Sequence, residues 1–221
     1  MMTGIRHALV LAAALLGGCA VLSGGKDAAV GVMSAHGFNA CTGAQPQAML
    51  GKDGTFFSCG FRGKRFHFEF DVADTNVCVA SEIKHPLDIA GGDRVEIYFV
   101  PDAAMTRGYR CAEIDAAGRV LSYSVDEAKK FDWFWKFSTL KSKARRTAAG
   151  YRVEGSVAVD ELVSFGIDPA SFFLGVFRAD MSAPGKVAAW CSLAPMLLPA
   201  HFHQPAMLLP FAPDGGPNGE N

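Results

Sequence analysis

The sequence lacks several features that define large classes of protein. It has no basic excess, since 21 Lys and Arg face 22 Asp and Glu in 221 residues, so no positive field is available to attract a nucleic-acid backbone. It contains no CxxC pair, no Cys/His cluster with zinc spacing and no CxxCH motif for covalent haem. The apolar run at 8–16 is too short to span a bilayer. We therefore expect neither a nucleic-acid partner nor a structural zinc site.

The N-terminus has the pattern of an export signal. Arg6 precedes the apolar run, and Leu16-Gly17-Gly18-Cys19 follows it and resembles a bacterial lipobox. We expect residues 1–18 to be a lipoprotein signal peptide and Cys19 to be lipidated. An ordinary signal peptide that ends in the same place is the alternative.

The expected location follows from the same segment. Ala20, and not Asp, comes after Cys19, which favours the outer membrane over retention at the inner one. The sequence thus predicts an outer-membrane lipoprotein of the bacterial cell envelope, with residues 19–35 as a tether. In that oxidising compartment the five cysteines beyond Cys19 form an odd set, so at least one thiol should stay unpaired.

A single folded domain should occupy residues 36–212, with 213–221 as a disordered tail. Half of the chain is hydrophobic and 17 residues are Phe, which is enough to fill a core. The stretch 93–101 (DRVEIYFVP) alternates with period two, which predicts a half-buried strand. Its two faces consist of Val95, Ile97 and Phe99 on one side and of Arg94, Glu96 and Tyr98 on the other.

Many further short strands with turn signals between them are expected. A hairpin should turn at 115–118, with Gly118 in a left-handed conformation, and one short helix should cover 160–165 with Asp160 as its N-cap. The other predicted strands are 55–62, 64–71, 77–81, 105–115, 119–125, 137–146, 151–159, 172–180 and 186–193. This pattern predicts an all-β protein: an antiparallel β-sandwich or jelly roll with one domain and little helix.

The order of these pieces resembles a known family. The motifs are FDVAD, DRVEIYFVPD, YRCAEIDAAGRV, YRVEGSVAVDEL, FFLGVFRAD, AAWCSL and FHQP. Together, over residues 56–211, they resemble the family 9 carbohydrate-binding modules and the related DOMON-like sandwiches that bind sugar or haem. The resemblance implies a sandwich that grips a glycan end between two Trp rings, with an Arg on the hydroxyls.

The resemblance also implies site residues. Arg110 matches the binding Arg, and Phe202 falls where one of the stacking rings stands. The other ring is replaced by Ala90, so we expect Arg110 and Phe202 to line one shallow site that is open on one side. A surface ion pair with Glu96 or Glu113 is the alternative for Arg110.

The aromatic cluster 131–135 (FDWFW) is a second candidate for sugar contact. Trp133 and Trp135 could offer flat apolar faces to a sugar ring, and Glu113 could accept its hydroxyls. Packing of the same rings in the core or at its rim is the equally weighted alternative.

Two further readings concern catalysis and haem. Glu113 and Asp115 form part of a glycosidase-like E-x-D-x-x-E signature, but no second Glu follows Asp115, so solvated carboxylates are the favoured alternative. Met105, Met181 and His85 are available as haem ligands for an electron-transfer sandwich.

The turn 71–76 is dense in oxygen-bearing side chains. Asp71, Asp74 and Asn76 are weak candidates for calcium, and a plain turn is the favoured alternative. The function expected overall is non-catalytic binding of a poly- or oligosaccharide, with a membrane contact through the lipid anchor and no cofactor other than this calcium.

Overall fold

The computed structural model describes residues 39–40, 46–51, 54–194 and 202–213. The expected signal peptide, the lipidated Cys19 and most of the tether lie outside the described residues, as do Cys41 and the tail from residue 214 on. In the part of the chain that the structure describes, no helix has the length and apolarity needed to cross a membrane.

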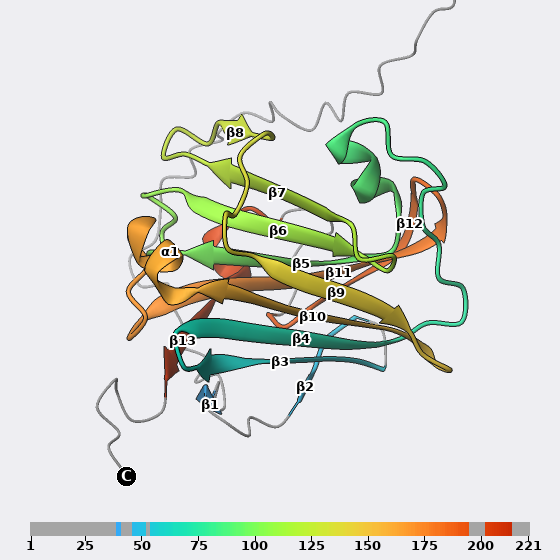
Figure 1. Cartoon of the computed structure of the whole chain (residues 1–221), viewed down its shortest axis with the longest axis horizontal. Helices are drawn as coiled ribbons and strands as arrows, with labels where there is room; N and C mark the ends of the chain where they lie inside the picture. The colour runs from blue at the N-terminus through green and yellow to red at the C-terminus, as the bar shows by residue number, and fades with distance from the viewer. Residues whose placement is uncertain (1–38, 41–45, 52–53, 195–201, 214–221) are drawn as a thin grey trace, which may run out of the picture. The chain divides into compact units, whose positions relative to one another are not determined.

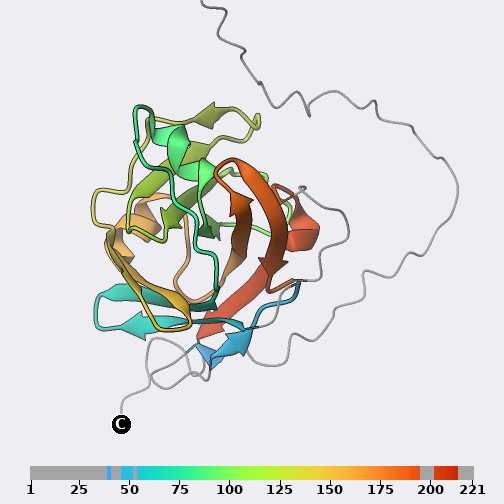
Figure 2. The same ribbon diagram turned by 90° about the vertical axis from the view of Figure 1, so that its right-hand side faces the viewer.

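The described residues form two β-sheets, which Figure 1 shows one in front of the other. All strand pairs are antiparallel except β1 with β13. The larger sheet has the spatial order β1 (Asn39–Ala40), β13 (Leu209–Pro213), β11 (Phe172–Ala183), β5 (Arg94–Val100), β6 (Tyr109–Asp115), β7 (Val120–Val125) and β8 (Phe131–Asp132), with β12 (Lys186–Ser192) paired to β11. The long β11–β12 hairpin is prominent in Figure 2.

The smaller sheet and three short helices complete the fold. The sheet has the order β2 (Gln47–Ala48), β3 (Thr55–Arg62), β4 (Arg65–Ala73), β10 (Gly150–Ala158) and β9 (Lys141–Arg146). The helices are η1 (Pro86–Gly91), α1 (Val159–Ser164) and η2 (Pro205–Met207). The prediction of an antiparallel all-β sandwich with little helix is confirmed.

Local predictions fail where a long-range contact intervenes. No strand forms at 77–81; instead the Asp93 carboxylate accepts the backbone N–H of Cys78, and the Cys78 carbonyl accepts the N–H of Asp93. Helix α1 forms, but its N-cap is Ala158, so Asp160 lies inside the first turn. Gly118 has the expected positive φ, of 84°.

The space between the two sheets is filled mainly by phenylalanine. The Phe66 ring lies edge-on to Phe99 at 5.5 Å, to Phe172 at 5.7 Å and to Phe211 at 5.3 Å, and all four rings are buried. These rings come from β4, β5, β11 and β13, so the cluster joins both sheets. Edge-to-face rings of this kind add about 0.5–1.5 kcal/mol per pair beyond the area that they bury.

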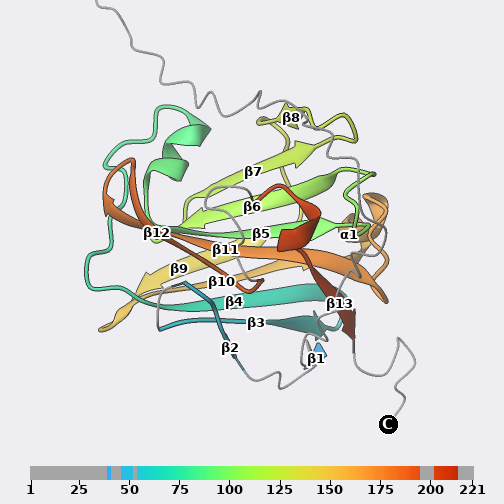
Figure 3. The same cartoon turned by 180° about the vertical axis from the view of Figure 1, so that it is seen from behind.

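The outer face of the larger sheet is also buried, which corrects the expected half-exposed strand. Every residue of β5 is buried. The outer face carries a second hydrophobic cluster, to which Tyr98 of β5 and Tyr109 of β6 belong together with Phe202, Met207 and Leu208. Seen from behind, the segment with η2 lies over this sheet (Figure 3). The chain therefore covers its own larger sheet on both sides.

Candidate binding site

A surface hollow of about 300 Å³ opens at the edge of the outer-face cluster. Three parts of the chain line it: residues 83–86 and 89 around η1, residues 119–122 at the start of β7, and Trp133 with Lys136 in the crossing between the two sheets. Helix η1, the short green helix in Figure 1, lies beside the start of β7. We call this hollow the η1 hollow.

Aromatic side chains flank the η1 hollow on the side of residues 131–136. Trp133 forms part of its wall and packs at 4.7 Å on Tyr123 and at 4.9 Å, stacked, on Phe131. The next residue, Phe134, is 75% exposed. Its ring lies 6.3 Å from that of His85, edge to face, and its backbone N–H donates to the Asp132 carboxylate. The loop thus places the solvent-exposed ring of Phe134 beside the hollow.

Polar and cationic groups line the same hollow. They are Lys84, His85, Arg119, Ser122 and Lys136. None of the described residues that line the hollow is acidic. Rings beside hydrogen-bond donors are the combination that sugar recognition requires.

Arg110 and Trp135 lie elsewhere and are in contact with each other. The Arg110 guanidinium sits 5.4 Å from the Trp135 ring and 5.1 Å from the Phe165 ring, and its Nη1 donates to the Tyr109 carbonyl. Trp135 and Phe165 pack against the cluster between the sheets. Burial lowers the pKa of Arg110 from its ordinary value.

Phe202 lies on the opposite side of the larger sheet from Arg110. It belongs to the outer-face cluster and contacts Trp190 at 4.1 Å and Phe177 at 5.1 Å. Arg110 alternates along β6 with Tyr109, which faces that cluster, and therefore faces the other way. The structure does not bring Arg110 and Phe202 together, so the single site expected from both is corrected.

Glu113 is buried in an ion-pair network on the outer face. The Nε of Arg94 donates to Glu113 Oε2 at 2.8 Å and to Glu96 Oε1 at 2.9 Å, and the Tyr98 hydroxyl donates to Glu96 Oε2 at 2.9 Å. Burial, followed by the neighbouring Glu96 charge, raises the pKa of Glu113 to about 8, against the opposing effect of Arg94. An ion pair of Arg110 with Glu96 or Glu113 was the alternative to sugar binding; the arginine that pairs with both is Arg94.

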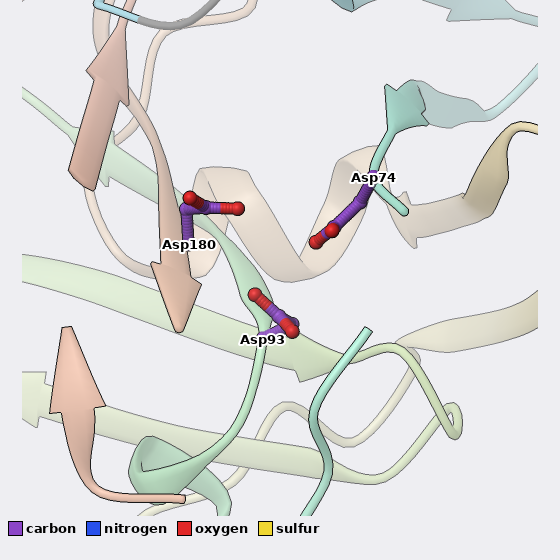
Figure 4. Close-up of side chains that lie close together, drawn as sticks. All are labelled: Asp74, Asp93 and Asp180. Atoms are coloured by element: carbon purple, nitrogen blue, oxygen red, sulfur yellow. The ribbon is translucent and has the colours of Figure 1, made fainter. Parts of the chain in front are cut away.

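A second buried charge network joins the two sheets. Arg178 Nη2 donates to Asp74 Oδ2 at 2.9 Å and to Asp180 Oδ1 at 2.7 Å, and its Nη1 donates to Thr55 at 3.0 Å. Asp93 lies beside them, and Figure 4 shows the three carboxylates pointing toward one another. Burial raises the pKa of Asp93 to about 6, although two backbone N–H groups oppose the shift.

The calcium ligands expected in the turn 71–76 do not gather there. Asp71 is exposed on β4, and the Asn76 amide donates to the carbonyl of Ser182. Asp74 turns inward, to Arg178 and within reach of Asp93 and Asp180. Of the described residues, these three aspartates are the set whose oxygens lie within 4.8 Å of one another.

The structure search places the fold among solved structures. No family model and no curated protein matches the chain. A protein from Bacteroides uniformis, described as a proposed carbohydrate-binding protein, matches with a TM-score of 0.55 at 14% identity, over 76% of this chain and 79% of that one. The two proteins share one fold.

The expected carbohydrate-binding-module-like β-sandwich is therefore confirmed as a fold. Two structures of a family 9 carbohydrate-binding module from Caldicellulosiruptor kristjanssonii also match at 15% identity. The one in complex with glucose has a TM-score of 0.47 and covers 76% of this chain and 80% of that one. The one in complex with cellotriose has a TM-score of 0.48 and covers 80% and 84%.

Of the residues predicted to contact sugar, Trp133 is the one that lines the η1 hollow of this sandwich. The sequence reasoning missed Phe134, His85, Arg119 and Lys136. A signal for Phe134 was present, because alternation in 131–135 directs its ring away from its two Trp neighbours. No sequence pattern linked His85, Arg119 and Lys136 to one another, since only the fold brings η1, β7 and the segment between β8 and β9 together.

The residues considered for haem do not support that alternative. Met105 is fully buried in the outer-face cluster, and Met181 is buried on β11, where its N–H donates to Asp93. His85 caps η1 by accepting the N–H of Leu87 on its Nδ1 at 3.2 Å. The Nδ1 atom of the His85 ring is therefore occupied by the hydrogen bond that caps η1.

Proposed function

We propose that the protein binds glycans without cleaving them, and that the η1 hollow is the site. The observation that carries this proposal is Phe134, a ring with three quarters of its surface exposed beside a hollow lined by donors. An exposed ring beside a hollow lined by donors offers the flat apolar face on which a sugar ring stacks. A sugar would lay its C–H face on Phe134 while Ser122, Lys84 and Lys136 reach its hydroxyls.

Affinity at such a site should be modest. One stacking ring contributes about 1 kcal/mol beyond the area that it buries, and a shallow site pays the full cost of ordering the ligand. Trp133 adds a fixed wall, because its ring is already packed on Tyr123 and Phe131. The likeness in fold to a protein to which carbohydrate binding has been attributed supports the same ligand class.

Binding without catalysis fits the distribution of carboxylates. A glycosidase needs two carboxyl groups that flank the scissile bond, and the described residues that line the η1 hollow include no acidic side chain. Glu113 is held by Arg94, and Asp115 by Arg119 at 2.6 Å. The two acids of the glycosidase-like signature therefore serve buried ion pairs.

The test is a glycan-array screen of the purified protein followed by titration of any glycan found. Phe134→Ala should weaken binding about tenfold, because it removes the stacking face. Phe56→Ala is the matched control, since Phe56 is also exposed, at 41%, but lies on β3 of the smaller sheet. Equal loss in both variants, or binding that survives Phe134→Ala unchanged, places the site elsewhere.

We further propose that the protein is exported and lipid-anchored at the outer membrane. The support is the lipobox-like Leu16-Gly17-Gly18-Cys19 and the Ala20 that follows it. Cys19→Ser should move the protein from the membrane fraction to the soluble one, because the acyl chains provide the attachment. Unchanged fractionation of the variant contradicts a lipid anchor.

We propose that glycan binding needs no cofactor. Calcium at the turn of Asp74 stays a prediction, and Arg178 already supplies a positive charge to Asp74 and Asp180. A chelator should therefore change the Tm of the protein by no more than about 2 °C, which corresponds to a loss of less than about 1 kcal/mol of stability. A larger fall in Tm that added calcium reverses would establish a structural metal.

A further inference from the structure

The η1 hollow has a charge pattern that bears on which glycans it takes. Its lining includes three permanently cationic side chains, Lys84, Arg119 and Lys136, and no carboxylate. The whole chain carries a net charge of −1, so this cationic lining is local and does not follow from composition. A neutral sugar needs no such excess, because hydroxyls are satisfied by mixed donors and acceptors.

Two acidic groups near the hollow are engaged by other hydrogen-bond donors. Asp115 is fully buried and accepts the N–H groups of Ala117 and Arg119 as well as the Arg119 Nε. Asp88 accepts the backbone N–H groups of Lys84 and His85, which lowers the pKa of its carboxyl. Neither carboxylate belongs to the lining.

Glu82 forms an ion pair with Lys84 at 3.0 Å, with both side chains largely exposed. An exposed pair of this kind is worth at most about 1 kcal/mol, so a ligand anion can compete for the lysine. The acidic neighbours therefore orient and partly balance the cations without closing the hollow to an anion.

Two of the cations differ in how they are held. Lys136 is exposed and makes no ion pair with any described residue. Arg119 is fixed by Asp115 and by the Ala80 carbonyl, which accepts Nη1 at 2.9 Å; its Nη2 is buried and has no hydrogen-bond partner in the described chain, so the guanidinium keeps one unsatisfied donor. A fixed guanidinium and a mobile ammonium at one hollow are the usual means of holding a carboxylate or a sulfate.

From this geometry, and resting on the proposed function, we infer that the η1 hollow selects anionic glycans, whose carboxylate or sulfate lies between Lys136 and Arg119 while Phe134 stacks on the sugar ring. Both acidic groups share the chemistry that the cations recognise. A carboxylate and a sulfate differ in shape and in how the negative charge is distributed over the oxygens, so the experiment includes glycans of both kinds.

The experiment titrates the purified full chain with four probes of similar length: an oligogalacturonate, a sulfated galactan oligosaccharide, neutral cello-oligosaccharide and polyglutamate. At least one acidic glycan should bind ten times or more tightly than the neutral one, because hydrogen bonds to charged groups are the stronger kind. Its affinity should fall as salt rises from about 0.05 to 0.5 M. Polyglutamate, which lacks a sugar ring, should bind at least tenfold more weakly than that glycan.

Two variants locate the effect. Lys136→Gln should weaken the acidic glycan about tenfold and the neutral one far less, because glutamine still donates to a hydroxyl but carries no charge. Lys141→Gln is the control, since Lys141 is exposed on β9 of the smaller sheet. Arg119→Lys keeps the charge but loses the planar fork, so it should weaken binding less than Lys136→Gln does; Tm of the variant checks that it is folded.

The outcomes separate the two proposals. Equal affinity for neutral and acidic glycans, with loss in Phe134→Ala, overturns the charge selection and keeps glycan binding. Binding of polyglutamate as tight as that of the acidic glycan overturns sugar recognition at the hollow. Selection for acid that is untouched in Lys136→Gln overturns the assigned residues.

Discussion

Two arginines on opposite faces of the larger sheet are each held by two carboxylates, but in different ways. Arg94 pairs with Glu96 of its own strand and with Glu113 of the neighbouring β6, all within one sheet. Its guanidinium also lies 5.1 Å from the Trp190 ring. This network fixes the outer face of a single sheet.

Arg178 instead connects two sheets. Its partners are Asp180 on its own strand, Asp74 just after β4 and Thr55 on β3, so two of its three contacts cross the sandwich. The residue is fully buried. Both arginines bind carboxylates through the guanidinium group. Arg178 thereby stabilises the contact between the two sheets, whereas Arg94 stabilises the outer face of the larger sheet.

The largest effect is expected from the arginine between the sheets. Arg178→Ala removes the buried positive charge that Arg178 supplies to Asp74 and Asp180 and should lower the free energy of unfolding by about 3–5 kcal/mol. Urea denaturation measures this. Arg178→Lys, which keeps the charge, is the control and should lose clearly less. A loss below 1 kcal/mol for the alanine variant would show that the network does not hold the sheets together.

Arg94→Ala should cost less, about 2 kcal/mol. Its two carboxylates are neighbours, and Glu113, with a pKa near 8, can stay protonated when the arginine is gone. The same urea experiment compares the two variants. Equal losses would break the distinction drawn between the two networks.

Glu113→Gln sharpens the comparison through pH. The folded pKa of Glu113, about 8, exceeds its ordinary value of 4.5, so the folded state binds more protons between these limits and stability falls as pH rises through them. Glutamine cannot lose a proton. The variant should match the wild type near pH 5 and exceed it by about 1 kcal/mol or more at pH 9. Parallel curves of unfolding free energy against pH would contradict the raised pKa.

The smallest effect is expected at Arg110, which pairs with no carboxylate in the described chain. Arg110→Ala removes contacts with the Trp135 and Phe165 rings and should cost about 1 kcal/mol. Because Arg110 does not line the η1 hollow, glycan affinity should stay within twofold of wild type. Calorimetric titration checks this, and a large loss of affinity in a folded variant would restore Arg110 to the binding site.

Most of the strands were predictable because period-two alternation is a local property. The prediction for 55–62 matches β3, and the hairpin that turns at 115–118 joins β6 and β7. Alternation along 93–101 also assigned Arg94, Glu96 and Tyr98 to one face. What it could not show is that both faces are covered, since the covering residues 202–208 lie about a hundred positions away in the sequence.

The candidate site shows the same division. By itself the sequence determined the sandwich and singled out 131–135 as an aromatic cluster, without showing which of its rings is exposed. Only the tertiary structure decided that Arg110 and Phe202 lie on opposite faces of one sheet, and that Trp133 meets Arg119 and Lys84 at the η1 hollow. The physical reason is that strand periodicity gives the direction of a side chain relative to its own strand, whereas a site depends on which distant segments pack against that strand.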